Sequence, residues 1–214
     1  MKYAVKNPRN LTAGQVNDFS AYLWEEVCGP IRKAGYELHN LSFQKLLYES
    51  LGIEFSIRPE EQEQVFWDNT ASGARMPNIE VLLNYLYENA IRSGVVSNIG
   101  FSGNALSNRI NRLLPDNHFE FIIATSEYMV RKPNPLIFNL ALSKAGLSAD
   151  EVWYCGDDTE NDVMGAFNAG IYPVWYHSFI PNDWRDKTLD EKPECEHLYI
   201  NDWLELIDIL EGLK

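Results

Sequence analysis

Ten consecutive residues, WYCGDDTEND at positions 153–162, decide how the rest of the chain is interpreted. The apolar run that ends at Gly156 predicts a short strand, and the glycine lets the backbone turn tightly after it. Three aspartates follow within six residues, at Asp157, Asp158 and Asp162. Carboxylates so close repel one another unless a cation joins them, and Mg²⁺ takes such oxygen ligands. The stretch therefore predicts a magnesium site, with an exposed acidic turn and N-capping aspartates as the alternative.

Short apolar runs alternate with helical periods on both sides of this stretch. Strands are expected at 94–97, 119–124, 151–155 and 171–176, and helices at 105–113, 136–145, 162–169 and 203–213. The polar stretch 181–196 is expected to form a loop. This alternation predicts an α/β fold, a doubly wound and mostly parallel sheet. Ligands of such sheets bind beyond the carboxyl ends of the strands, so the functional side chains are expected there.

The first ninety or so residues are typical of helices alone. Apolar stripes predict one helix from Thr12 or Asn10 to the pair Gly29-Pro30, and a second that Gly52 closes. Two more are expected to open at Pro59 and Pro77, because proline is favoured in a first helical turn. We therefore expect a helical piece over residues 10–75 and an α/β core over residues 76–214.

Charge and composition exclude several classes of function. The net charge is −13, so nucleic acid is an unsuitable partner, while a small anionic substrate would need a local cation. No apolar run approaches the roughly 20 residues that span a bilayer, and the polar N-terminus has no signal-peptide core. A cytoplasmic protein without a membrane partner is expected. The three cysteines are far apart, which argues against a zinc site, and Cys155 is expected to be a buried core thiol.

Two further features stand at or near predicted strand ends. Ser97 and Asn98 follow the strand at 94–97, where a hydroxyl and free backbone N–H groups can hold a phosphoryl oxygen. Lys132 precedes Pro133 and a helix, where an ammonium can neutralise a transferring phosphoryl group. Each has a simpler alternative: Ser-Asn is a common turn, and a single lysine in a proline-rich loop is usually solvated.

Taken in order, Ser97, Lys132-Pro133 and the Gly-Asp-Asp-x-x-Asn-Asp run at 156–162 resemble motifs two, three and four of the haloacid dehalogenase superfamily of hydrolases. The resemblance covers essentially the whole chain. It implies a Rossmann-like core, with the helical segment before Ser97 as the small cap that closes over the site and shapes substrate choice.

The first motif of that family is absent. It is Asp-x-Asp-x-Thr after the opening central strand, and no two aspartates of this sequence are spaced by one residue. The segment Tyr3-Ala4-Val5 is too short to be that strand. We expect either an N-terminally truncated chain that is inactive as it stands, or a catalytically dead relative that binds a phosphorylated ligand. Without the strand, exposed sheet edges predict self-association.

The resemblance implies a magnesium-dependent phosphatase that cleaves a small phosphate ester through an aspartyl-phosphate. It implies that Asp157 binds the metal, with Asp162 and then Asp158 as further ligands, and that Ser97, the Asn98 backbone and Lys132 hold the phosphoryl group. A dehalogenase of the same superfamily is the alternative, although such enzymes need no metal. A receiver domain uses similar residues, but its acidic pair comes early in the chain.

Overall fold

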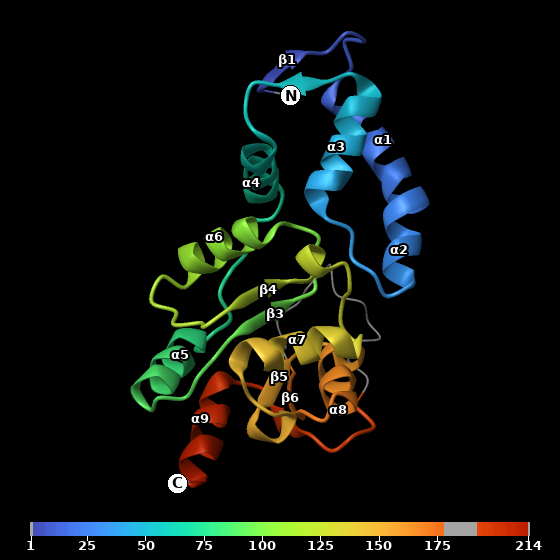
Figure 1. Cartoon of the computed structure of the whole chain (residues 1–214). Helices are drawn as coiled ribbons and strands as arrows, with labels where there is room; N and C mark the ends of the chain where they lie inside the picture. The colour runs from blue at the N-terminus through green and yellow to red at the C-terminus, as the bar shows by residue number, and fades with distance from the viewer. Residues whose placement is uncertain (1, 178–191, 214) are drawn as a thin grey trace. The chain divides into compact units, whose positions relative to one another are not determined.

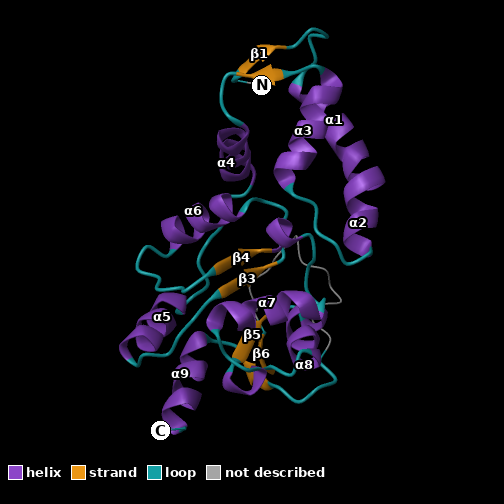
Figure 2. Cartoon of the chain, in the orientation of Figure 1, coloured by secondary structure: helices purple, strands orange, loops and turns teal. Residues whose placement is uncertain are grey.

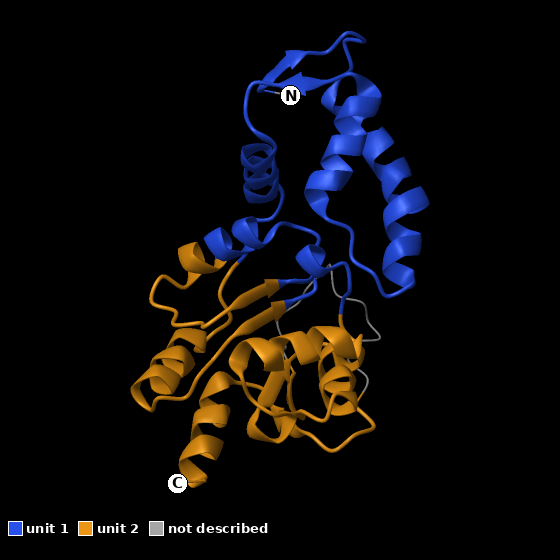
Figure 3. Cartoon of the chain, in the orientation of Figure 1, with its two compact units in different colours: residues 1–73, 97–109, 124–131 blue, residues 74–96, 110–123, 132–214 orange. Residues whose placement is uncertain are grey.

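The computed structural model, drawn in Figure 1, describes residues 2–177 and 192–213, and Figure 3 shows its two compact units. Unit 1 contains residues 1–73, 97–109 and 124–131, and unit 2 contains residues 74–96, 110–123 and 132–214. Because the units alternate along the chain, the division into a cap over 10–75 and a core over 76–214 stays a prediction. The loop expected over 181–196 lies mostly outside the described residues.

Unit 1 is a helical body with a small two-stranded sheet. Its elements up to residue 70 are β1 (Ala4–Lys6), α1 (Ala13–Leu23), a π-helical turn (Trp24–Cys28), α2 (Gly29–Lys33), α3 (Asn40–Leu51), β2 (Glu54–Phe55) and α4 (Pro59–Thr70). Its buried core joins α1, α3 and the residue before β2 through Val16, Leu23, Leu47, Leu51 and Ile53. The capping box of Thr12 and Gln15 starts α1, and Gly52 ends α3 with φ 70°. The helix expected from Pro59 is confirmed.

Two expectations about this region are wrong. The pair Gly29-Pro30 does not end the first helix, which continues through the π-helical turn into α2. The Gly29 N–H donates to the Trp24 carbonyl in the wider π pattern, and Pro30 stands in the first turn of α2, where a missing N–H costs little. Residues 1–90 are also not helical alone. The strand Ala4–Lys6 pairs antiparallel with Glu54–Phe55, as Figure 2 shows.

Unit 2 holds most of the α/β part. Elements wholly within it are α5 (Ile79–Glu88), α7 (Pro135–Ala145), a 3-10 helix (Ala149–Glu151), β5 (Trp153–Gly156), a π-helical segment (Thr159–Met164), α8 (Gly165–Asn168), β6 (Tyr172–Tyr176), β7 (Leu198–Ile200) and α9 (Trp203–Gly212). The strands β5, β6 and β7 form one parallel sheet. Its core joins β6 and β7 to α5 and α9 through Leu82, Val174, Tyr176, Ile200 and Leu206.

Three elements are shared between the units. They are β3 (Val95–Ser97), α6 (Gly103–Leu113) and β4 (Ile122–Ala124), and β3 pairs with β4 in a two-stranded sheet. A 3-10 turn (Thr125–Tyr128) follows β4 within unit 1. The four expected strands are thus confirmed within a few residues, and so is the α/β class. The strand β7 was not expected, and part of the helix expected over 162–169 is π-helical.

The two neighbouring strands β5 and β6 differ in burial. Four residues of β6 are buried, and β6 lies between β5 and β7. Among the described residues β5 is hydrogen-bonded to β6 alone, and it alternates between exposed and half-buried positions. The expectation that Cys155 is a buried core thiol is wrong, because the residue is exposed. No helix of the described residues is long and apolar enough to cross a membrane.

Candidate active site

A buried ion pair is the centre of the candidate site. The Lys132 ammonium nitrogen lies 2.5 Å from Oδ1 of Asp162. Lys132 is 7% exposed and Asp162 is 5% exposed. Lys132 comes just before α7, and Asp162 lies in the π-helical segment after β5, so the fold joins two positions that the sequence separates by 30 residues. A buried charge needs a partner and further hydrogen bonds, and this pair has both.

Tyr154 completes the surroundings of the lysine. The ammonium donates to the Tyr154 hydroxyl oxygen at 3.0 Å and to the Val96 carbonyl at 3.2 Å. The same hydroxyl lies 3.3 Å from Oδ1 of Asp162. All four residues belong to unit 2. The sequence analysis did not single out Tyr154. Side chains alternate along a strand, so Tyr154 lies on the same face of β5 as Gly156, the residue before the acidic turn.

The electrostatics keep this lysine charged. Burial lowers the pKa of Lys132, but the Asp162 carboxylate and the Tyr154 oxygen raise it by more, so that the pKa lies above its ordinary value. Burial also raises the pKa of the Tyr154 hydroxyl, which Lys132 opposes only in part. At neutral pH the site therefore holds a permanent ammonium beside a neutral phenol.

Gly156 lets Asp162 approach the strand. A Cβ at position 156 would collide with Cβ, Cγ and Oδ2 of Asp162, so only glycine leaves room for this carboxylate. On its other oxygen, Asp162 accepts a hydrogen bond from the Asp158 N–H at 3.2 Å. Both oxygens of Asp162 are thus engaged by the protein, which suits a residue that positions Lys132.

Asp158 serves the local backbone. Its Oδ1 accepts hydrogen bonds from the N–H groups of Glu160 at 3.1 Å and Asn161 at 2.8 Å, and its Oδ2 accepts from the Asn161 side chain at 2.6 Å. These are the contacts of an N-cap, which satisfy the open donors at a helix start. The capping alternative thus describes Asp158 well, and its part in binding metal stays a prediction.

Asp157 differs from its neighbours because it is exposed. It is the first residue after β5, and its charge helps to raise the pKa of Tyr176, after burial and Asp202. Among residues 2–177 and 192–213, no three His, Cys, Asp or Glu side chains form a group that would hold a metal ion. Magnesium needs only one or two protein carboxylates when water and phosphate supply the rest, so the exposed Asp157 fits such an ion.

Ser97 and Asn98 belong to unit 1, so their position beside the Lys132 cluster stays a prediction. Within unit 1 the loop that follows them is firmly held. The Ile99 N–H donates to the hydroxyl of the buried Thr125 at 3.1 Å, and the Ser126 N–H donates to the Ile99 carbonyl at 3.2 Å. The structure thus fixes this loop through Thr125 and Ser126, which the sequence did not single out.

Carboxylates occupy the start of α6, the helix that follows Ser97 and Asn98 in the chain. The Ser102 N–H donates to the fully buried Glu63 at 3.1 Å, and the Gly103 N–H donates to Glu127 at 2.7 Å. Glu63 also accepts a hydrogen bond from the Asn40 amide at 3.1 Å. Two donors at this helix start are therefore used inside unit 1.

The fold and the site define one class of protein. It has an α/β core in which a buried lysine pairs with the acidic turn that follows a strand of the parallel sheet. Comparison with known proteins gives the family: the model for haloacid dehalogenase-like hydrolases matches residues 43–175, and the chain belongs to this family. Among relatives, pyrimidine 5'-nucleotidase YjjG of Escherichia coli is 29% identical over 170 residues, 74% of each chain.

Other relatives match over a smaller part. Glyceraldehyde 3-phosphate phosphatase of Pyrococcus abyssi is 33% identical over 47% of this chain, and that of Methanopyrus kandleri is 30% identical over 64%. The matches span 42% and 57% of the lengths of those two relatives.

Solved structures agree on the fold. A 2-haloacid dehalogenase from Pseudomonas syringae has a TM-score of 0.59 at 18% identity, over 96% of this chain and 84% of its own. A phosphatase of the family from Thermococcus onnurineus has a TM-score of 0.57 at 21% identity, over 78% and 70%. At these identities the likeness concerns the fold alone.

Proposed function

We propose that the protein acts on a small phosphate ester as a magnesium-dependent phosphatase of its family. The observation that carries the proposal is the buried ion pair of Lys132 and Asp162, together with the exposed Asp157 in the same acidic stretch as Asp162. A permanent cation and an exposed carboxylate in one α/β core suit a phosphoryl group that arrives with a metal ion. The relatives named as phosphatases and as a nucleotidase point the same way.

Each residue has a distinct role in this proposal. Asp157 holds Mg²⁺, which when bound neutralises charge on the phosphoryl oxygens. Lys132 neutralises the same group, and Asp162 with Tyr154 holds the ammonium in place and charged. The Ser97 hydroxyl and the Asn98 backbone N–H hold phosphoryl oxygens. Asp158 caps the turn, with direct binding of the metal as a secondary role.

The covalent step of the proposal needs an aspartate nucleophile. In the family that aspartate belongs to an Asp-x-Asp pair, and these 214 residues contain no such pair. Supplied with such an aspartate, the site would act on the ester. We propose that these 214 residues by themselves bind phosphate with Mg²⁺ but do not turn over an ester.

Calorimetric titration of the chain with inorganic phosphate, with and without Mg²⁺, tests the proposal. We expect binding that requires Mg²⁺ and that Asp157→Asn weakens about tenfold or more, the loss of one charged contact. The matched control is Asp208→Asn, an exposed aspartate on α9, which is expected to change nothing. Binding that ignores Mg²⁺, or equal effects of the two variants, would refute the assignment.

Turnover separates the remaining alternatives. Steady hydrolysis of p-nitrophenyl phosphate by the chain would keep the phosphatase and overturn the expected inactivity. Release of chloride from a 2-chloroacid without metal would instead support a dehalogenase. The Pseudomonas syringae enzyme, which has a similar fold, is a 2-haloacid dehalogenase.

A further inference from the structure

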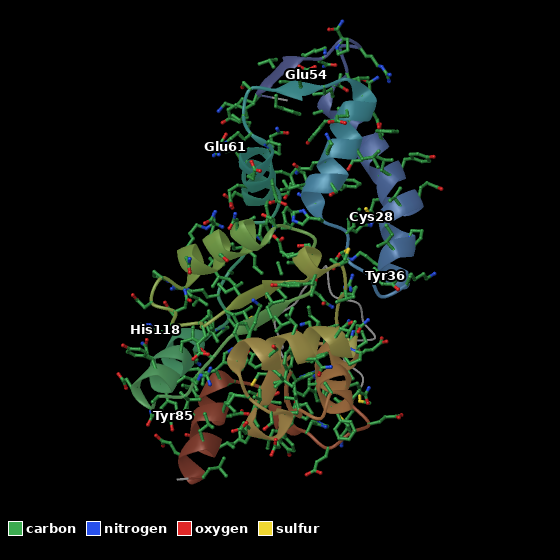
Figure 4. The ribbon with its side chains drawn as sticks, viewed as in Figure 1. Cys28, Tyr36, Glu54, Glu61, Tyr85 and His118 are labelled. Carbon is green, nitrogen blue, oxygen red and sulfur yellow. The ribbon has the colours of Figure 1, made fainter. Side chains whose placement is uncertain are left out.

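Glu63 is a buried carboxylate to which the proposed mechanism gives no role. It stands in the middle of α4 and is 0% exposed. An acidic side chain is seldom buried without partners, because its charge loses the stabilisation that water gives. Glu61, which Figure 4 labels on the same helix, is exposed and pairs with Arg58. Two glutamates of one helix thus have opposite surroundings.

Neutral donors surround the carboxylate of Glu63. Its Oε1 accepts hydrogen bonds from the Asn40 amide and from the Ser102 N–H, each at 3.1 Å. Its Oε2 accepts a hydrogen bond from the Ser102 hydroxyl, whose oxygen in turn accepts one from the Ala105 N–H at 3.2 Å. Surroundings made of donors suit an acceptor-only carboxylate, and an amide nitrogen at this position would face them with its own N–H groups.

The two partners of Glu63 hold the loop that follows Asn98. Ser102 is the last residue of this loop, directly before α6 begins at Gly103. The backbone N–H of Asn40 donates to the Gly100 carbonyl at 2.7 Å, so that Asn40 contacts both Glu63 and the middle of the loop. One glutamate of α4 is therefore connected to the loop at two points.

Two more carbonyls of this loop are held within unit 1. The Ile99 carbonyl accepts a hydrogen bond from the Ser126 N–H at 3.2 Å, and the Phe101 carbonyl accepts one from the Ser126 hydroxyl at 2.6 Å. The Phe101 ring also stacks on Trp67, with ring centroids 4.1 Å apart. In a trans peptide the N–H points opposite to the C=O, so the next N–H groups are turned away from these partners. Successive N–H groups turned to one side suit an anion.

We propose that Glu63 is a positioning residue for the proposed phosphoryl site. It does not touch phosphate itself. It holds Ser102 and Asn40, and these hold the loop whose first backbone N–H, that of Asn98, binds a phosphoryl oxygen. The inference rests on the proposed function, because the role of this loop comes from it. The helix α4 thereby sets the shape of the phosphate-binding loop within unit 1.

The direction of the change in affinity separates positioning from simple repulsion. A negative charge repels phosphate, so removal of the Glu63 charge would by itself strengthen phosphate binding. Loss of a positioning contact weakens binding instead, by about tenfold, a scale typical of residues that hold a binding group in place. Glu63→Gln distinguishes the two effects, because it removes the charge and keeps nearly the same shape.

Calorimetric titration of the full chain with inorganic phosphate in the presence of Mg²⁺ measures the effect. We expect Glu63→Gln to weaken binding about tenfold. The matched control is Glu61→Gln, which removes the same charge from an exposed position of α4 and is expected to leave the affinity unchanged. NMR spectra of the phosphate-free, isotope-labelled chain give a second readout. Glu63→Gln is expected to shift the amide signals of Gly100 and Phe101 and to leave those of α1 in place.

The possible outcomes are distinct. If Glu63→Gln binds phosphate as tightly as the unaltered chain or more tightly, or if the signals of Gly100 and Phe101 do not move, the positioning role is overturned and the proposed function stands. If the unaltered chain binds no phosphate, the proposed function fails and this inference fails with it. Should Glu63→Gln fail to fold, Asn40→Ala replaces it, since it removes one donor and keeps the backbone contact with Gly100. A loss of about threefold is then expected, and an unchanged affinity would overturn the role.

Discussion

The Lys132 ammonium is 2.5 Å from the carboxylate of Asp162, and the two side chains are 9% and 8% exposed. Breaking such a pair leaves an uncompensated buried charge, which typically costs about 3–5 kcal/mol. We therefore expect Asp162→Asn to lower the free energy of unfolding by that amount in urea denaturation. Asp208→Asn on the exposed face of α9 is the control and is expected to stay within about 0.5 kcal/mol. Equal effects of the two variants would show that the pair contributes no stability.

The raised pKa of Lys132 predicts a pH dependence. A group whose folded pKa exceeds its unfolded value, about 10.4 for lysine, contributes stability that is complete below that value and is lost as pH rises toward the folded pKa. The difference in unfolding free energy between the unaltered chain and Lys132→Met should therefore stay constant up to about pH 10 and then decrease. A difference that already decreases between neutral pH and about pH 9 would contradict a raised pKa.

Gly156 is expected to tolerate no side chain. The Cβ of Gly156→Ala would collide with Asp162, so the carboxylate must move, at a cost of about 1–3 kcal/mol or more. Gly212→Ala is the matched control, because a Cβ there meets open space at the end of α9. Thermal unfolding of both variants checks the expectation, and a Gly156→Ala protein as stable as the control would refute the close approach.

Asp158 offers a way to separate capping from metal binding. Asp158→Ala removes the cap of the π-helical segment and is expected to cost about 1 kcal/mol, whereas Asp158→Ser keeps a good capping oxygen and most of that stability. Phosphate binding with Mg²⁺ is then measured on Asp158→Ser. Undiminished binding assigns this residue to the cap, and a large loss would make it a metal ligand after all.

The half-exposed strand β5 leads us to propose self-association. Among the described residues β5 is hydrogen-bonded on one side only, and strand edges of this kind pair with other chains. Sedimentation velocity over a range of protein concentrations is expected to show a growing oligomeric fraction. Trp153→Lys, a charge at an exposed position of β5, should reduce that fraction. A chain that stays monomeric and unfolds sharply at high temperature would refute the proposal.

The Glu63 cluster and the Lys132 cluster show where sequence reasoning stops. A glutamate in an acidic first half of α4 is expected to be solvated, yet Glu63 is fully buried against Ser102 and Asn40. Lys132 was singled out for its place before a proline, but Tyr154 was not, because a tyrosine in an apolar strand resembles any core residue. Neither β1 nor β2 was expected, since strands of three and two residues have too few positions to show a period.

The sequence by itself determined the α/β class, most of the longer helices and strands, and the acidic turn after Gly156. These features depend on neighbouring residues, through side-chain periodicity and the backbone freedom of glycine, so a local pattern can report them. Only the tertiary structure decided that Asp162 pairs with Lys132, and that Asp158 caps a turn while Asp157 stays exposed. Such pairings depend on how distant segments pack together, and packing is a property of the folded chain that no short stretch contains.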